Sequence, residues 1–264
     1  MTKTRSLEQT TIQTFDEQIH GDVLQPGKEG YDEARTVWNA MIDREPAVIV
    51  RCSGTADVIA AVNFARDLDL RLSIHGGGHN VAGNAVCDDG LMIDLSPMDN
   101  VHVDPLSKIA RVGGGATWAD VDHETQAFGL ATTGGIVSDT GVAGLTLGGG
   151  TGFLDRKHGL AHDNLRSMDI VTADGEFVRA NEDEHRELFW GMRGGGGNFG
   201  IATSFEFDLH ELGPEILSVR LLYPYEAAAD VLRFYGQFME GAPPDIECYA
   251  GFVRGSPEYG LPEG

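Results

Sequence analysis

Four clusters of consecutive glycines constrain the fold of this chain, which has 264 residues and contains 36 glycines in all. They occupy residues 76–78, 113–115, 148–150 and 194–197, and each is bracketed by a different strand or helix pattern. Glycine allows backbone conformations that other residues avoid, and it lets backbone N–H groups approach an anion closely. The clusters are therefore expected to be loops around an anionic group such as a phosphate, and not a low-complexity linker.

The first cluster follows a strand. Residues 47–52 predict a buried strand, residues 56–68 carry apolar side chains at helical spacing, and residues 70–74 predict a second strand that runs into the glycines. The loop thus ends the second strand of a βαβ unit. A Rossmann dinucleotide-binding domain has its glycines after the first strand and opens a helix with them. The pattern therefore excludes nicotinamide binding of that kind.

The chain continues as alternating short strands and helices. The patterns predict strands over 91–95, 101–103, 109–112 and 200–209, a hairpin over 165–179, and helices over 117–128 and 183–192. Thr117 is the expected cap of the first of these helices. The large side chains expected in the core are Trp118, Phe128, Phe189 and Trp190.

A domain boundary is expected at Leu212–Pro214, where Gly and Pro interrupt the pattern. Residues 1–41 predict an N-terminal arm with a short helix around 31–41. Residues 214–264 predict the start of a second domain. Within it, a strand is expected over 217–223, a helix over 226–239 and an irregular tail over 255–264.

The net charge is strongly negative, because 41 acidic residues face 19 basic ones and give a formal charge of −22. A surface rich in carboxylates is typical of a protein that stays folded in concentrated salt, which screens self-repulsion. A merely acidic protein of ordinary surroundings is the alternative. In either case nucleic acid is excluded as a partner, because phosphate contacts need basic side chains.

The chain offers no pattern for a disulfide framework, a metal or a membrane. Cys52, Cys87 and Cys248 are odd in number and have no metal spacing, so they are expected to be small buried side chains. His158 and His162 lack a third ligand nearby. The N-terminus is polar and no apolar run reaches the length of a membrane span, so a cytoplasmic protein is expected.

Four ordered motifs resemble a known family. They are HGGGHNVAG at 75–83, TGVAGLTLGGGTG at 140–152, RKHGL at 156–160 with Asp163 and Asn164, and FWGMRGGGGNFG at 189–200. Together they closely resemble the FAD-linked oxidases of the berberine-bridge-enzyme-like branch of the vanillyl-alcohol oxidase and p-cresol methylhydroxylase superfamily. The resemblance implies an α+β fold: a two-subdomain FAD-binding domain of the p-cresol methylhydroxylase type over 42–213, followed over 214–264 by the start of a truncated α+β substrate domain.

The resemblance also implies where FAD is held. The loop 76–83 corresponds to the pyrophosphate-binding loop, residues 140–152 run along the pyrophosphate and the isoalloxazine ring, and residues 195–201 contact the ribityl and adenosine parts. His79 matches the histidine that is bonded to the 8α-methyl carbon of the flavin. The cofactor-binding residues implied are His75, Gly76, Gly77, Gly78, His79, Asn80, Gly83, Thr140, Gly141, Gly144, Leu145, Gly148, Gly149, Gly150, Gly152, Asn198, Gly200 and Ile201.

The chain departs from the family pattern in three ways. Val137 stands where doubly linked members have a cysteine, so a single link through His79 is expected. His75 stands where relatives usually have arginine. Most of the substrate domain, which usually supplies the tyrosine or carboxylate base, is lacking. No catalytic base is therefore assigned, and Tyr223, Tyr225 and Tyr249 are expected to be half-buried packing residues.

The function implied by the resemblance is that of an FAD-dependent oxidoreductase. It would move a hydride from an alcohol or amine C–H bond of a small molecule to flavin N5, and oxygen or another acceptor would reoxidise the flavin. The alternative is a fragment that binds FAD without turnover, or one half of a split enzyme whose second chain supplies the substrate domain.

Overall fold

The first sheet carries the loop at 76–83. In the computed structural model, which describes residues 8–257, this sheet has the order β1-β2-β4-β3. Its strands are β1 (Asp22–Leu24), β2 (Val48–Arg51), β4 (Leu91–Asp94) and β3 (Leu72–His75). β2, β4 and β3 are parallel, and β1 is antiparallel to β2. The helix α3 (Thr55–Asp67) connects β2 to β3, but β4 lies between them, so the predicted βαβ unit encloses a third strand.

Both faces of this sheet are buried, as is usual for parallel strands. Val48 and Val50 lie in one cluster with the buried residues of α3 and of α1 (Gln9–Asp16), whereas Ile49 and Met92 pack on the opposite face with Tyr31. Tyr31 donates a hydrogen bond to the carbonyl oxygen of Pro46 at 2.6 Å, and burial raises its pKa to about 12.

The N-terminal segment is more structured than the predicted arm. It contributes α1 and the edge strand β1, and the expected helix over 31–41 is the single turn α2 (Tyr31–Ala34). Buried Asp57 fixes this segment to α3, because its carboxylate accepts hydrogen bonds from the N–H groups of His20 and Gly21. Such ties are formed between distant residues and leave no local pattern in the sequence.

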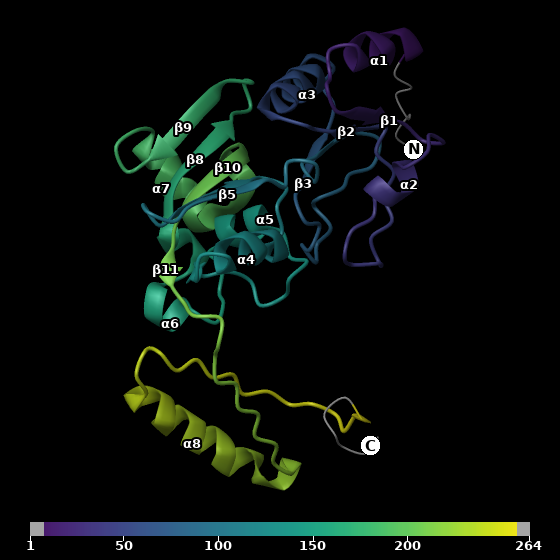
Figure 1. Ribbon diagram of the computed structural model, residues 1–264. Helices are drawn as coiled ribbons and strands as arrows, with labels where there is room; N and C mark the ends of the chain where they lie inside the picture. Colours follow the sequence, from purple (N-terminus) through teal and green to yellow (C-terminus); the bar gives the residue numbers. More distant parts are fainter. Residues whose placement is uncertain (1–7, 258–264) are drawn as a thin grey trace. The chain divides into compact units, whose positions relative to one another are not determined.

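The second sheet is antiparallel, with the order β5-β6-β10-β8-β9. Its strands are β5 (Val101–Asp104), β6 (Ile109–Gly113), β10 (Ile201–Asp208), β8 (Leu165–Val171) and β9 (Phe177–Asn181). Its core contains buried residues of α4 (Trp118–Gln126), α5 (Val142–Leu147) and α7 (Arg186–Gly195), including Trp118 and Phe189, and these helices lie by the sheet in Figure 1. Thr117 caps α4 as predicted, and its hydroxyl and N–H both contact Asp120.

Two of the predicted core side chains are exposed. Phe128 is 50 % exposed because α4 ends at Gln126 and Phe128 lies in the turn beyond it. Trp190 is 72 % exposed because α7 turns Phe189 and Met192 towards the core and leaves Trp190 on the solvent side. The shorter elements near these helices are β7 (Leu130–Ala131), α6 (Asp155–His158), η1 (Ala161–Asn164), η2 (Gly196–Phe199) and β11 (His210–Glu211).

The chain divides between Pro214 and Glu215 into two units. The second contains η3 (Tyr225–Ala227) and α8 (Ala228–Gly241), close to the predicted helix. The prediction of a strand over 217–223 is wrong, since these residues pair with no other strand among those described. None of residues 215–257 is buried, and Tyr223, Tyr225 and Tyr249 are exposed. Most of the predicted tail, residues 258–264, lies outside the described residues.

Across residues 8–257, no helix has the length and the apolar character needed to cross a membrane.

Candidate cofactor site

Two of the glycine loops cross with their backbones in contact. A Cβ atom placed on Gly77 would lie 2.4 Å from the backbone nitrogen of Gly141, and one placed on Gly141 would lie 2.5 Å from that of Gly77. No side chain fits at either position without a backbone shift. Backbone hydrogen bonds hold the second loop in place. The backbone N–H of Trp118 donates to the carbonyl oxygen of Thr140, and the backbone N–H of Val142 donates to that of Ala116. The crossing therefore brings the first two predicted cofactor segments, 76–83 and 140–152, together.

The loop after β3 presents unpaired backbone donors. Within the part of the chain that the structure describes, the N–H groups of residues 76–79 donate no hydrogen bond to protein. Gly78 has a φ of +67°, which reverses the chain within the loop. Backbone N–H groups left free in a tight glycine turn are a site for a phosphate-like anion. The loop therefore fits one phosphate or a diphosphate, as the resemblance implies for FAD.

The His75 side chain lies against this loop. Its Nδ1 lies 3.3 Å from Oδ1 of Asp94, and its Nε2 lies under Gly78, where a Cβ atom would be only 2.6 Å away. Asp94 is nearly fully buried and also accepts hydrogen bonds from the N–H and hydroxyl of Ser96. Burial alone would raise the pKa of Asp94, but hydrogen bonds from His75 and Ser96 outweigh it and hold that pKa below its usual range. The His75 ring thus lies against the loop, beside Gly78.

We expect the protein to lose stability in acid as Asp94 becomes protonated. Because the pKa of Asp94 is lower in the folded chain than in the unfolded chain, folding is favoured above the unfolded value of about 4 and that contribution is lost as the pH falls below it. Asp94→Asn should flatten this dependence and cost about 2 kcal/mol at pH 7 through weakened bonds to His75 and Arg51. Urea unfolding between pH 3 and 7 measures both effects. An unchanged slope below pH 5 would contradict the assignment.

His79 is held between two side chains from other parts of the chain. The ring of Trp38 stacks on the His79 ring with centroids 5.7 Å apart and an interplanar angle of 22°. Nε2 of His79 lies 3.4 Å from Oδ1 of Asp139. The N–H of Trp38 donates to the carbonyl oxygen of Gly78 at 3.2 Å, which ties this tryptophan to the loop. Neither neighbour is predicted from the sequence, although Asp139 directly precedes the motif at 140–152.

The helix α5 contributes an open surface beside the loop crossing. Gly144 lies inside α5, and a Cβ atom on it would have no atom within 4 Å. The side chain of the next residue, Leu145, packs against Gly135 and Gly150 and does not cover Gly144. Glycine inside a helix costs about 0.5–1 kcal/mol relative to alanine, and no packing contact here offsets that cost. An open surface at a helical glycine is what a flat ligand ring would need.

The other predicted cofactor residues have different surroundings. Gly148 ends α5, Gly149 and Gly150 have positive φ, and a Cβ atom on Gly152 would collide with the carbonyl oxygen of Gly134. Asn80 and Gly83 complete the first loop, where the Asn80 side chain accepts the N–H of Ala82.

The last predicted segment lies beside α5. The short helix η2, which contains Asn198, packs against α5. Gly200 lies against Ile170 and Val171, whereas the Ile201 side chain is buried at the start of β10. Ile201 could therefore contact a cofactor only through its backbone.

Asn164 orders the segment between α6 and β8. Its amide donates to the carbonyl oxygens of His158 and Leu160, and its Oδ1 lies 2.6 Å from Nε2 of His210. The rings of His158 and His210 stack with centroids 3.7 Å apart. Burial lowers the pKa of His210, so this ring is neutral at pH 7 and can donate from Nε2. His158 therefore has a packing partner, and residues 8–257 contain no group of three potential metal ligands.

Asn164→Ala should destabilise the first unit by about 2 kcal/mol, because Asn164 is buried and the substitution leaves two partly buried carbonyl oxygens and His210 without their partner. Thermal or urea unfolding measures the loss. Asn84→Ala is the matched control, since Asn84 is exposed. Equal stability of the two variants would show that the Asn164 bonds do not hold this segment.

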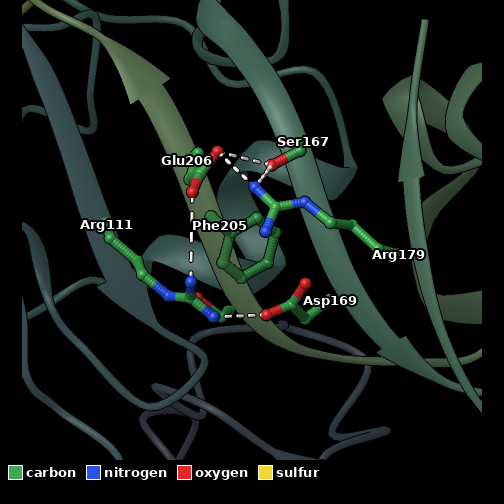
Figure 2. Close-up of a pocket in the computed structure, with 7 residues that line it drawn as sticks. Arg111, Ser167, Asp169, Arg179, Phe205 and Glu206 are labelled. Atoms are coloured by element: carbon green, nitrogen blue, oxygen red, sulfur yellow. Dashed lines mark hydrogen bonds and ion pairs between the residues drawn. The ribbon is translucent and has the colours of Figure 1, made fainter. Parts of the chain in front are cut away.

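A hollow on the second sheet is filled by ion pairs and is not a ligand site. Figure 2 shows Arg111 and Arg179 reaching across the strands to acidic partners. Arg111 contacts Asp169 at 2.5 Å, and Arg179 contacts Glu206 at 2.6 Å and the hydroxyl of Ser167 at 2.9 Å. Each guanidinium is paired, so neither is available to hold an anion. This network stabilises the polar face of the sheet.

Comparison with known proteins agrees with this geometry. The family described as FAD binding domain matches residues 46–181, just over half of the chain. The (R)-6-hydroxynicotine oxidase of Paenarthrobacter nicotinovorans is 40 % identical over 200 residues, which are 76 % of this chain and 44 % of that protein. The chain spans about half the length of the curated relatives it matches.

Two solved structures are similar in fold. The BBE-like 1 protein of Physcomitrella patens has a TM-score of 0.72 at 29 % identity, covering 76 % of this chain and 44 % of that one. Glucooligosaccharide oxidase from Acremonium strictum, which carries a 6-S-cysteinyl, 8α-N1-histidyl FAD, has a TM-score of 0.68 at 36 % identity, covering 72 % and 41 %. The chain therefore belongs to the FAD binding domain family, among the berberine-bridge-enzyme-like FAD-linked oxidoreductases of the vanillyl-alcohol oxidase and p-cresol methylhydroxylase superfamily.

Proposed function

We propose that the first unit holds FAD along the two crossed glycine loops, with a single covalent link to His79, as the cofactor-binding part of an oxidoreductase. The observation that carries this proposal is the contact of Gly77 with Gly141 beside four consecutive free N–H groups at 76–79. The free N–H groups suit the pyrophosphate, and the open face at Gly144 suits the ring. Val137 leaves the segment before Asp139 without a thiol for a second link.

The residues of this chain would bind and orient the cofactor. Residues 76–79 would bind the pyrophosphate through backbone N–H groups, His75 would support that loop, and residues 140–152 would lie along the ring. When bound, FAD supplies the acceptor for a hydride taken from an alcohol or amine C–H bond. Oxygen or another acceptor would then take the electrons.

A second candidate is FAD binding without turnover. The observation in its favour is that residues 215–257, where the substrate domain is expected, bury none of their side chains. The relatives give no support to a second chain as the source of that domain. A panel of alcohols and amines added anaerobically to the flavin-loaded protein separates the two candidates, because only turnover bleaches the flavin absorption.

Cofactor titration tests the proposed binding mode. Protein freed of flavin should take up one FAD per chain and should bind FAD at least about tenfold more tightly than riboflavin, which lacks the phosphates that the loop would hold. Inorganic pyrophosphate should compete with FAD. Equal affinity for FAD and riboflavin would contradict the role given to residues 76–79, and no uptake of either would contradict the proposal as a whole.

A further inference from the structure

The two nitrogens of the His79 ring have different surroundings. Nε2 lies within ion-pair distance of the Asp139 carboxylate, 3.4 Å from Oδ1. Within the described residues, Nδ1 contacts no polar group of the protein. The ring is mostly shielded, since the His79 side chain is 23 % exposed. Trp38 stacks on one face of the ring. A carboxylate beside one imidazole nitrogen keeps the proton there and leaves the other nitrogen with its lone pair.

Asp139 is held in a fixed position for this role. It lies in the turn that the N–H of Thr140 closes on the carbonyl oxygen of Val137 at 3.1 Å. Both sides of the turn are fastened to the start of α4, because Ala119 donates to the carbonyl oxygen of Ser138 and Trp118 donates to that of Thr140. The carboxylate is 72 % exposed, so a proton that it accepts can pass to water.

From this geometry we infer that Asp139 is a positioning residue for flavin attachment, which fixes His79 with its proton on Nε2 and so selects Nδ1 as the nitrogen that bonds to the flavin. The inference rests on the proposed function. Attachment forms a bond between Nδ1 and the flavin C8α atom and breaks one C8α–H bond. The Nε2 proton passes to Asp139 and then to water. The proton of the broken C–H bond passes to water, and its two electrons reduce the flavin, which takes up protons from water. Dioxygen then reoxidises the flavin with formation of hydrogen peroxide.

The test follows the rate of covalent attachment after FAD is added to flavin-free protein. Samples are denatured with acid at intervals, and the flavin fluorescence that stays with the chain on a denaturing gel is measured. Asp139→Ala should attach flavin about 10- to 100-fold more slowly than the wild type. Asp139→Asn, which keeps an oxygen acceptor but loses the charge, should fall between them. Non-covalent FAD affinity should stay within about threefold, because residues 76–79 are unchanged.

The matched control is Glu124→Gln. Glu124 lies 3.0 Å from Nδ1 of His123 on the exposed side of α4, so this variant removes the charge of a similar histidine–carboxylate pair away from the loops. Its attachment rate should equal that of the wild type, and thermal unfolding should be alike for all variants. NMR of the flavin-bearing peptide should identify the Nδ1 isomer in the wild type.

The outcomes distinguish failure of the Asp139 role from failure of the covalent link and from failure of FAD binding. Attachment by Asp139→Ala at the wild-type rate, or an Nε2 link in the wild type, would overturn the role of Asp139 alone. Wild-type protein that binds FAD but never attaches it would overturn both the link and this inference. Wild-type protein that binds no FAD would overturn the proposed function as well.

Discussion

His79→Ala should abolish covalent attachment of flavin while FAD still binds reversibly. The reason is that His79 is the nucleophile in the proposed link, whereas the donors that suit the pyrophosphate are backbone N–H groups, which the substitution leaves in place. The loss of stacking on Trp38 should weaken binding by no more than about tenfold. Gel fluorescence after denaturation measures attachment, and titration with FAD measures the remaining affinity.

The matched control for this variant is His123→Ala, since His123 is an exposed histidine that also pairs with a carboxylate. Its attachment should equal that of the wild type. Flavin that remains on the chain of His79→Ala after denaturation would mean that another side chain forms the link. Loss of all FAD binding by His79→Ala would mean that the imidazole, and not the backbone of the loop, supplies most of the affinity.

Gly77→Ala should lower FAD affinity by at least about tenfold and should cost about 1–3 kcal/mol in folding stability. A methyl group on Gly77 would lie 2.4 Å from the Gly141 backbone nitrogen, so the two loops must separate. Since each loop supplies part of the proposed site, their separation should impair binding even where the rest of the fold persists. Urea unfolding and FAD titration of the same preparation measure the two effects.

Gly144→Ala serves as the comparison, because it adds the same methyl group where no atom lies within 4 Å. It should leave stability unchanged or raise it by about 0.5–1 kcal/mol, as expected for glycine replaced by alanine in a helix. It should nevertheless weaken FAD binding about tenfold if the ring lies against α5. Wild-type affinity in Gly144→Ala would place the ring elsewhere, and wild-type stability in Gly77→Ala would show that the loop crossing tolerates separation.

The parts of the fold that depend on neighbouring residues could be predicted from the sequence. The capping of α4 by Thr117 and the hairpin of β8 and β9 follow from local patterns, and the structure contains both. The insertion of β4 between β2 and β3 could not be predicted, because strand order is set by packing between distant segments. Trp190 was misplaced because a one-residue difference in helix phase moves a side chain from the core to the solvent.

In the candidate site, too, the features set by local sequence could be predicted and the contacts between distant segments could not. The glycine loops have strong signals in the sequence, because positive φ angles and backbone contacts admit few other residues. The neighbours of His79 have no such signal. Trp38 and Asp139 come from segments on either side of it in the chain, and only the folded structure brings their side chains to the same imidazole. Likewise, the burial of Asp94 beneath the loop depends on the order of strands in the first sheet.

The most direct test of the account is the mass of the denatured wild-type chain, measured after incubation with FAD in air. We expect a single species heavier than the unmodified chain by one FAD less two hydrogen atoms, with peptide mapping that places the addition on His79. A chain of unmodified mass, in protein that also takes up no flavin reversibly, would contradict the central claim that the two crossed glycine loops hold FAD.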